Sequence, residues 1–234
     1  GLGFANTLYG FLILPESLPR ECRSPLRWNS ANPIGALHLL RSDRVLTGLS
    51  VVNFVAQTAH VVLPSTYVLY ATYRYGWDTT TVGLTLAMVG ICAMIVQGLG
   101  IGPIVSRLGE RRALMLGLCC GALGFLIFAL APTGPLSWLG IPVMALWGVS
   151  GAAIQALATQ LVAPDQQGQL QGANSSVQSV AQLVGPFLFT LTFAYFIGAQ
   201  APLQLPGAPF LLASALLLLA LLIAARTLAG ARVR

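Results

Sequence analysis

Residues 102–112 read Gly-Pro-Ile-Val-Ser-Arg-Leu-Gly-Glu-Arg-Arg. This stretch, with its two glycines and four charged residues, lies between two long runs, 79–101 and 113–164, that contain no Asp, Glu, Lys or Arg. Charges that occur only between uncharged runs of about 20 residues or more are typical of a chain that crosses a membrane several times. The pattern therefore predicts a polytopic membrane protein and excludes the soluble enzyme folds.

The composition of the whole chain agrees with this prediction. Its 234 residues are 56% hydrophobic and 8% charged, and its mean hydropathy is +0.79, whereas soluble domains carry about 25% charged residues. The six carboxylates all lie at the boundaries of apolar runs: Glu16, Glu21, Asp43, Asp78, Glu110 and Asp165. Because the 12 basic residues are all Arg at similar boundaries, the net charge of +6 indicates membrane orientation and not nucleic-acid binding.

Six apolar segments are each long enough to cross the bilayer as a helix. They are Val45–Tyr73, Thr80–Ser106, Arg111–Ala131, Ser137–Val162, Gly168–Ile197 and Pro209–Ala225. Residues 1–14 form a shorter apolar stretch, which we interpret as the end of a further spanning helix whose start precedes this chain. Residues 15–44, with four prolines and five arginines, are predicted to form a central linker, residues 45–225 a six-helix bundle, and residues 226–234 a tail.

The arginines are distributed unevenly over the connections between these segments. When alternate connections are grouped together, 11 arginines lie on one side of the membrane and only Arg74 lies on the other. Since cytoplasmic loops are enriched in Arg and Lys, we expect the central linker, the 102–112 loop and the C-terminus to be cytoplasmic.

Polar side chains recur on one face of the first segment. Asn53, Gln57, His60 and Tyr67 follow helical spacing, and polar groups at membrane depth are costly unless they face protein or water. We favour a wet cavity that binds an amphipathic solute over the alternative, in which these groups only hydrogen-bond to neighbouring helices. The His60 imidazole is able to carry a proton near neutral pH, although a lone intramembrane His is more often a neutral hydrogen-bonding group.

Two other segments contribute candidate cavity residues. Trp147 and Gln155 belong to the fourth segment, and Asn174, Gln178 and Gln182 recur every fourth residue in the fifth. The third and sixth segments carry almost no polar side chains, so we expect them to face lipid.

Gly185 and Pro186 lie together in the fifth segment. Pro removes a backbone hydrogen bond and Gly lets a neighbouring helix approach closely, so the pair predicts a helix bend. The sequence leaves open whether this bend moves during function or is a static kink.

Nothing in the sequence predicts a metal site, a cofactor or an active site. The four cysteines (Cys22, Cys92, Cys119 and Cys120) form no C-x-x-C pair and suit small apolar positions in helices. The chain also has no H-E-x-x-H or G-x-S-x-G motif. We therefore expect neither a cofactor nor enzyme activity.

The 102–112 loop is a candidate cytoplasmic gating element, formed by Gly102, Ser106, Arg107, Gly109, Arg111 and Arg112. It resembles the loop motif G-x-L-x-D-R-x-G-R-R of the major facilitator superfamily, in the copy between helices 8 and 9. Gly102, Arg107, Gly109 and Arg111 match the motif. Ser106 stands where an acid is usual, and Glu110 stands where a basic residue is common.

Other stretches resemble one group within this superfamily, the tetracycline-resistance-like drug:proton antiporters. They are residues 12–19 (LILPESLP), 32–37 (NPIGAL), 75–78 (YGWD) and 167–172 (QGQLQG). The resemblance covers essentially the whole chain. It departs from the group at residues 119–122, which lack the acid that tetracycline exporters have in helix 9, and this weakens the case for tetracycline as the substrate.

The resemblance implies an all-α membrane protein: the C-terminal six-helix bundle of the major facilitator fold, helices 7 to 12, preceded by the end of helix 6. It implies export of drugs or other amphipathic molecules from a bacterial cell through the inner membrane, driven by protons and by the rocking of two bundles. The partners would be the lipid bilayer, a small-molecule substrate, protons and an N-terminal six-helix bundle.

A second reading of the sequence stays open. The chain would then be a half-length membrane protein without transport of its own, whose polar faces need a partner bundle to cover them.

Overall fold

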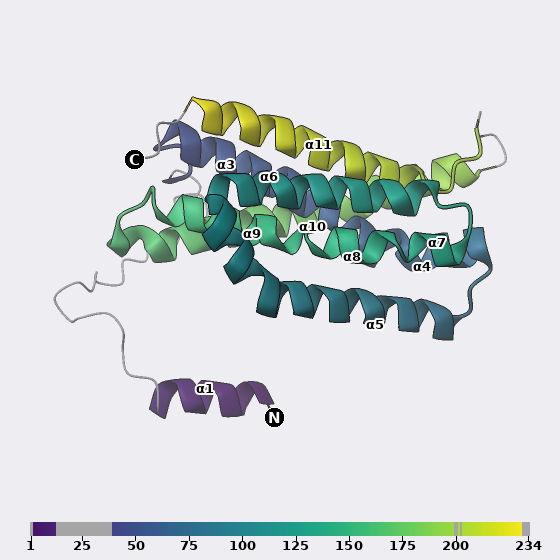
Figure 1. Ribbon diagram of the computed structural model, residues 1–234, viewed down its shortest axis with the longest axis horizontal. Coiled ribbons are helices and arrows are strands. Elements are labelled where there is room, and N and C mark those ends of the chain that lie inside the picture. The colour runs from purple at the N-terminus through teal and green to yellow at the C-terminus, as the bar shows by residue number, and fades with distance from the viewer. Residues whose placement is uncertain (1, 13–38, 199–200, 202, 231–234) are drawn as a thin grey trace.

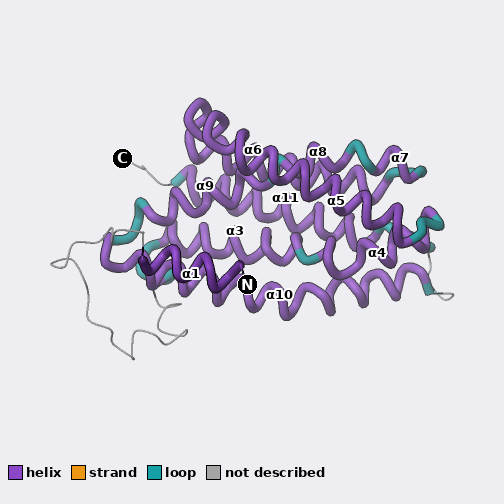
Figure 2. Tube along the Cα trace, turned by 90° about the horizontal axis from the view of Figure 1, so that it is seen from below, coloured by secondary structure: helices purple, strands orange, loops and turns teal. Residues whose placement is uncertain are grey.

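The computed structural model describes residues 2–12, 39–198, 201 and 203–230, and every regular element in these ranges is a helix. The long helices lie side by side along the longest axis of the molecule (Figures 1 and 2). The predicted all-α class is therefore confirmed. Residues 13–38, which include most of the predicted linker (15–44), and the last four residues of the tail lie outside the described residues.

Among the described residues, five continuous helical stretches are long and apolar enough to span a membrane: Arg44–Tyr75, Thr79–Leu130, Gly134–Thr159, Pro164–Ile197 and Ala208–Ala229. Thr79–Leu130 has 52 residues and would be about 78 Å long as one straight helix, far more than the roughly 30 Å of a bilayer core. Its backbone leaves helical geometry at Gly109 (φ 75°, ψ 159°), and in Figure 1 the chain reverses direction in this region. This stretch therefore holds both the second and the third predicted segments.

The stretches are built from shorter elements. The first contains α3 (Arg44–His60) and α4 (Val62–Tyr75), and the second contains α5 (Thr79–Ile95), the π-helical turn η3 (Val96–Gly100) and α6 (Ile101–Leu130). The third contains α7 (Gly134–Ser137), α8 (Gly140–Ala145) and α9 (Gly148–Thr159). The rest are η4 (Pro164–Gln166), α10 (Gln167–Ile197) and α11 (Ala208–Ala229), and α1 (Leu2–Leu12) precedes them all.

Two of the boundary carboxylates act as helix N-caps. Asp43 accepts hydrogen bonds from the backbone N–H groups of Val45 (2.7 Å) and Leu46 (3.1 Å) at the start of α3. Asp78 accepts from the N–H (3.0 Å) and the hydroxyl (2.5 Å) of Thr81 at the start of α5, and these bonds lower the pKa of Asp78. The acids at the ends of apolar runs thus fix where two helices begin.

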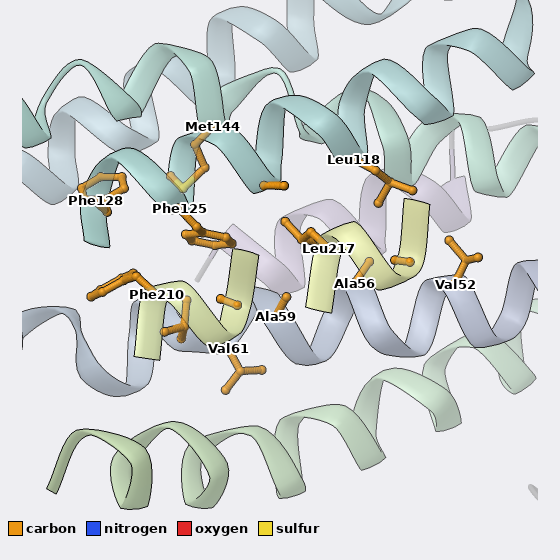
Figure 3. Packing of buried hydrophobic residues seen from close by; sticks show 14 of the residues in the cluster. Val52, Ala56, Ala59, Val61, Leu118, Phe125, Phe128, Met144, Phe210 and Leu217 are labelled. Atoms are coloured by element: carbon orange, nitrogen blue, oxygen red, sulfur yellow. The ribbon is translucent and has the colours of Figure 1, made fainter. Parts of the chain in front are cut away.

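The core lies between α3, α6 and α11 (Figure 3). Phe128 and Phe125 on α6 point towards Phe210 on α11, with ring centroids 5.9 Å and 6.3 Å from it. The third and sixth segments, expected to face lipid, therefore also form the centre of the core. The far side of α6 is exposed at Leu116, Leu123 and Leu130.

Small residues let α6 approach the α8–α9 stretch closely. A Cβ added at Gly117 would lie 2.7 Å from the backbone nitrogen of Ser150, and one at Gly124 would lie 2.9 Å from the Cα of Met144. The two glycines are seven residues apart and so share one face of the helix. This packing holds the α8–α9 stretch in the position from which it lines the site described below.

Arg74 ties together the end of the bundle that lies opposite the 102–112 loop. Its guanidinium donates two hydrogen bonds to the carbonyl oxygen of Ala131 (3.0 and 3.2 Å), directly after α6. The hydroxyl of Tyr75 donates to the same carbonyl (3.0 Å), and that of Tyr70 donates to the carbonyl of Phe128 (2.6 Å). The lone Arg of this side thus caps a helix C-terminus, where a positive charge is favourable.

Candidate functional site

A cavity of about 220 Å³ opens among three of the helical stretches. Its lining comes from α3 and α4, from α5 with the π turn, and from α8 and α9. The lining residues are Asn53, Ala56, Gln57, His60, Leu63, Val89, Ala93, Gln97, Met144, Ala145, Trp147, Gly148, Ser150, Gly151 and Ile154. None of these residues is Asp, Glu, Lys or Arg, so the cavity wall that they form carries no fixed charge.

Each of the three stretches loses regular α-helical hydrogen bonding at the level of the cavity. At the α3–α4 junction, Pro64 has no N–H to donate to the carbonyl of His60. In addition, the N–H of Val61 donates to the carbonyl of Thr58 (3.2 Å), which is three residues back and not four as in a regular α-helix. At the α8–α9 junction, the N–H of Trp147 bonds to Met144 (2.9 Å), three residues back. The third irregularity is the π turn itself, and π turns are often found at functional sites.

Two rings and three amides give the cavity its chemistry. The ring centroids of His60 and Trp147 lie 5.1 Å apart, with their planes at 53°, and the ring centroid of Phe125 lies 5.8 Å from that of Trp147. Asn53, Gln57 and Gln97 place carboxamide groups on the wall. Such a surface offers flat apolar contact together with donors and acceptors, which is what an amphipathic aromatic molecule needs.

Four of the nine predicted cavity residues line this cavity: Asn53, Gln57, His60 and Trp147. Tyr67 does not. It is 1% exposed and packs edge-on against Phe128 and Phe210. The spacing that joined Tyr67 to the other residues assumed one continuous helix, and the interruption at Val61 changes the face that follows.

The other four predicted residues lie away from the cavity lining. Asn174 on α10 donates a hydrogen bond to Gln155 on α9 (3.2 Å), so these two amides join neighbouring helices. Gln178 and Gln182 are exposed on α10. Their role in substrate binding stays a prediction.

Sequence reasoning missed Gln97, which lines the cavity from the π turn. One signal was available, because Gln97 is the only Asn or Gln in residues 79–106. An amide at membrane depth is costly unless it faces protein or water, so its position indicates a polar contact. Gly148, Ser150 and Gly151 were missed because small residues in a membrane helix normally indicate close packing.

The predicted gating loop forms the tight turn inside α6. Gly109 has a backbone conformation that is essentially restricted to glycine, and the side chains of Ser106, Arg107 and Arg112 are exposed around it. Glu110 accepts a long hydrogen bond from the side chain of Gln160 (3.5 Å).

A groove lies beside this turn, between α6 and α9. It is lined by Ile101, Gly102, Val105, Ser106, Gly109 and Glu110 on α6 and by Ala152 and Ala156 on α9. The turn, the groove and the cavity therefore all lie along the α9 side of the second stretch.

Gly185 permits the close approach that was predicted for it. A Cβ at this position would lie 2.7 Å from the Cβ of Val61, at the α3–α4 junction. α10 continues as one helix through Pro186, and a functional bend there stays a prediction.

Within the described residues, no group of three or more His, Cys, Asp or Glu side chains is arranged to hold a metal ion. Cys92, Cys119 and Cys120 are free thiols.

Comparison with known proteins adds a family and a fold. A family model described as Major Facilitator Superfamily matches residues 1–186 and, in a second placement, residues 49–232. The solved structure of the human organic anion transporter MFSD10 (TETRAN) superposes with a TM-score of 0.78 at 21% identity, covering 94% of this chain and 54% of that chain. The likeness to MFSD10 concerns the fold.

Curated relatives include tetracycline resistance proteins. The class C protein of Escherichia coli is 32% identical over 192 residues, 81% of this chain and 48% of the relative. The class G protein of Vibrio anguillarum is 36% identical over 167 residues, 69% of this chain and 42% of the relative. Human hippocampus abundant transcript-like protein 1 is 25% identical over 232 residues, 91% of this chain and 46% of the relative. The chain thus spans about half the length of the curated relatives it matches.

Proposed function

The chain belongs to the major facilitator superfamily, and from this premise we propose that it forms the C-terminal half of a proton-driven exporter of drugs or other amphipathic small molecules. The observation that supports the proposal most strongly is the cavity between α3, α5–η3 and α8–α9. It is enclosed by interrupted helices, and transporters of several folds build their substrate sites from such helices. The likeness to tetracycline resistance proteins supports export as the direction of transport.

We assign the binding of substrate to five side chains of the cavity wall. Asn53, Gln57 and Gln97 exchange hydrogen bonds with polar groups of the solute, and the rings of His60 and Trp147 hold its apolar face. Because this wall carries no fixed charge, it favours a neutral solute, or one whose charge is compensated by the other half of the transporter.

We propose that proton coupling depends on an acidic group of the second bundle. The cavity wall contains no carboxylate, and His60 is the one lining side chain whose charge can change by uptake of a proton. A proton that competes with the substrate therefore binds either to His60 or to an acidic group of the second bundle, and we favour the acidic group.

The exposed face of α10 supports a second six-helix bundle as the partner of this chain. This face carries Gln171, Ser175, Gln178 and Gln182 within a helix that is long and apolar enough to span the membrane. Amides facing lipid are costly, so we propose that the N-terminal bundle covers them. We place the protein in a bacterial inner membrane, as the likeness to tetracycline resistance proteins of bacteria suggests. The arginine distribution supports an orientation with the linker, the 102–112 loop and the C-terminus in the cytoplasm.

Transport into inverted membrane vesicles tests the proposal. Vesicles that contain the full-length gene product are energised by respiration, and the uptake of ethidium and of tetracycline is measured with and without a protonophore. We expect uptake of at least one compound that the protonophore abolishes. Uptake equal to that of vesicles without the protein, for a broad panel of amphipathic drugs, contradicts export. Uptake that survives the protonophore contradicts proton coupling.

Gln57→Ala and Gln204→Ala form a matched pair for the same assay. Gln57 lines the cavity, and Gln204 is an exposed glutamine of the loop before α11. Loss of one hydrogen bond to the substrate should raise the KM of Gln57→Ala by about three- to tenfold, whereas Gln204→Ala should behave as the unmodified protein. Equal KM values for the two variants would remove Gln57 from the binding site.

A further inference from the structure

Between Val89 and Val105, the second helical stretch keeps one face towards α8 and α9. Val89 lines the cavity together with Met144 of α8, and Val105, 16 residues later, lines the groove beside the 102–112 turn together with Ala152 of α9. A regular α-helix turns by about 100° per residue, so residues 16 apart would point about 160° away from each other. A regular helix therefore cannot place both valines against the same neighbour.

The π turn removes this mismatch. The N–H of Ile101 bonds to the carbonyl of Val96, five residues back, so Val96–Gly100 accommodates one residue more than an α-turn does. Because the π turn absorbs this additional residue, the 16 residues rotate the helix only as far as 15 α-helical residues would, and the angle between Val89 and Val105 is about 60°. The π turn thus sets the rotation of the cytoplasmic end of this helix, and of the 102–112 loop, relative to the cavity wall that carries Gln97.

Pro103 gives a chemical reason for the π turn at this place. A proline has no N–H to donate to the carbonyl four residues back, here that of Leu99, and its ring collides with that carbonyl in a regular helix. Gly98 and Gly100 add backbone freedom on the N-terminal side of the proline. The α-helical alternative is therefore penalised at the residues where the π turn lies.

We propose that Pro103 is a positioning residue, which acts through the π turn to hold the cytoplasmic end of the helix in register with the cavity. Replacing Pro103 by Ala supplies the missing donor and removes the ring, so that Val96–Gly100 reverts to α-helical bonding. The segment from Ile101 to Leu108 then rotates by about 100° relative to the cavity. The role of this rotational register in transport rests on the proposed function. The register itself, which is the rotation of the segment from Ile101 to Leu108 relative to the cavity, does not depend on that function.

A cysteine cross-link tests the register without any transport measurement. In a full-length protein in which Cys22, Cys92, Cys119 and Cys120 are replaced by Ser, Val105→Cys and Ala152→Cys are introduced together, because both side chains line the same groove. The probe is a short bifunctional maleimide added to membranes. We expect efficient cross-linking in this protein and a loss of about tenfold when Pro103→Ala is added, because Val105 turns away from α9.

A one-residue deletion separates altered register from general damage. Deleting Gly98 in the Pro103→Ala protein removes the additional residue, so a regular α-helix then places both ends on the original face, and we expect the cross-link to return. Pro186→Ala, a proline replacement in α10, is the matched control and should leave the cross-link unchanged. An unchanged cross-link in Pro103→Ala, or no recovery on deletion of Gly98, overturns the proposal.

Drug uptake by the same variants is measured separately. We expect Pro103→Ala to slow turnover and the deletion of Gly98 to restore it in part. If the unmodified protein transports nothing, the proposed function fails, while the cross-link still decides the role of Pro103.

Discussion

At the scale of single residues, the sequence predicted the cavity-lining side chains correctly only where the helix that carries them is regular. Asn53, Gln57 and His60 were predicted from spacings of four and three residues, and they line the cavity because α3 is unbroken up to His60. Tyr67 follows the same spacing, but it lies beyond the interruption at Val61 and packs in the core. Spacing alone does not reveal where a helix is interrupted.

Arg74 shows what a charge count leaves out. Its position on the Arg-poor side was an exception to the orientation pattern, and only the structure shows the acceptor that holds it, the carbonyl of Ala131. A contact between residues 57 positions apart in the chain depends on how helices assemble, which periodicity does not encode.

We predict that Arg74→Ala destabilises the folded bundle by about 1–2 kcal/mol, since it removes two hydrogen bonds and a positive charge from the C-terminus of α6. Arg74→Lys should retain part of this stability, because lysine keeps the charge but lacks the planar pair of donors. Thermal unfolding in detergent measures both variants. Arg112→Ala, at an exposed arginine, is the control, and an equal loss in Arg74→Ala and Arg112→Ala would contradict the capping role.

At the scale of elements, the apolar segments were predictable, but their neighbours were not. Each of the six predicted segments corresponds to a helical stretch or to half of one, because uncharged runs of this length have few alternatives in a membrane. The third and sixth segments were expected to face lipid, yet they meet at Phe128 and Phe210 in the core. Lipid and the protein core are both apolar, so hydropathy does not distinguish them.

The positions at which helices are interrupted could not be predicted from the sequence either. Pro64 and Pro103 were visible, but whether a proline produces a kink, a π turn or a break depends on how neighbouring helices satisfy the backbone. The cavity forms where three such interruptions meet, and this explains why Gln97 was not recognised.

The turn at Gly109 gives a prediction at the same scale. A side chain at its φ of 75° and ψ of 159° is strained by about 1–3 kcal/mol, so Gly109→Ala should lower both the melting temperature and the yield of folded protein. Gly102→Ala is the matched control, because a Cβ there meets nothing within 4 Å and the residue is helical. Equal melting temperatures for the two variants would show that the turn adapts to a side chain.

At the scale of the whole molecule, the exposed amides of α10 and the half-length match to relatives both point to a second bundle. We predict that the protein purified from its native membrane has an intact mass of roughly twice 24.6 kDa, as a transporter of two six-helix bundles requires. A mass near 24.6 kDa without a co-purifying membrane protein would support the half-length alternative and contradict the proposed exporter.

We propose that the uncharged cavity between α3, α5–η3 and α8–α9 binds the transported molecule. The most direct test is the rate at which a maleimide labels Gln57→Cys in the otherwise cysteine-free protein, with and without a drug that the vesicle assay identifies as transported. Gln204→Cys, in the exposed loop before α11, is the reference position. We predict that the drug slows labelling at residue 57 and leaves labelling at residue 204 unchanged. Equal labelling of Gln57→Cys with and without saturating drug would contradict substrate binding in this cavity.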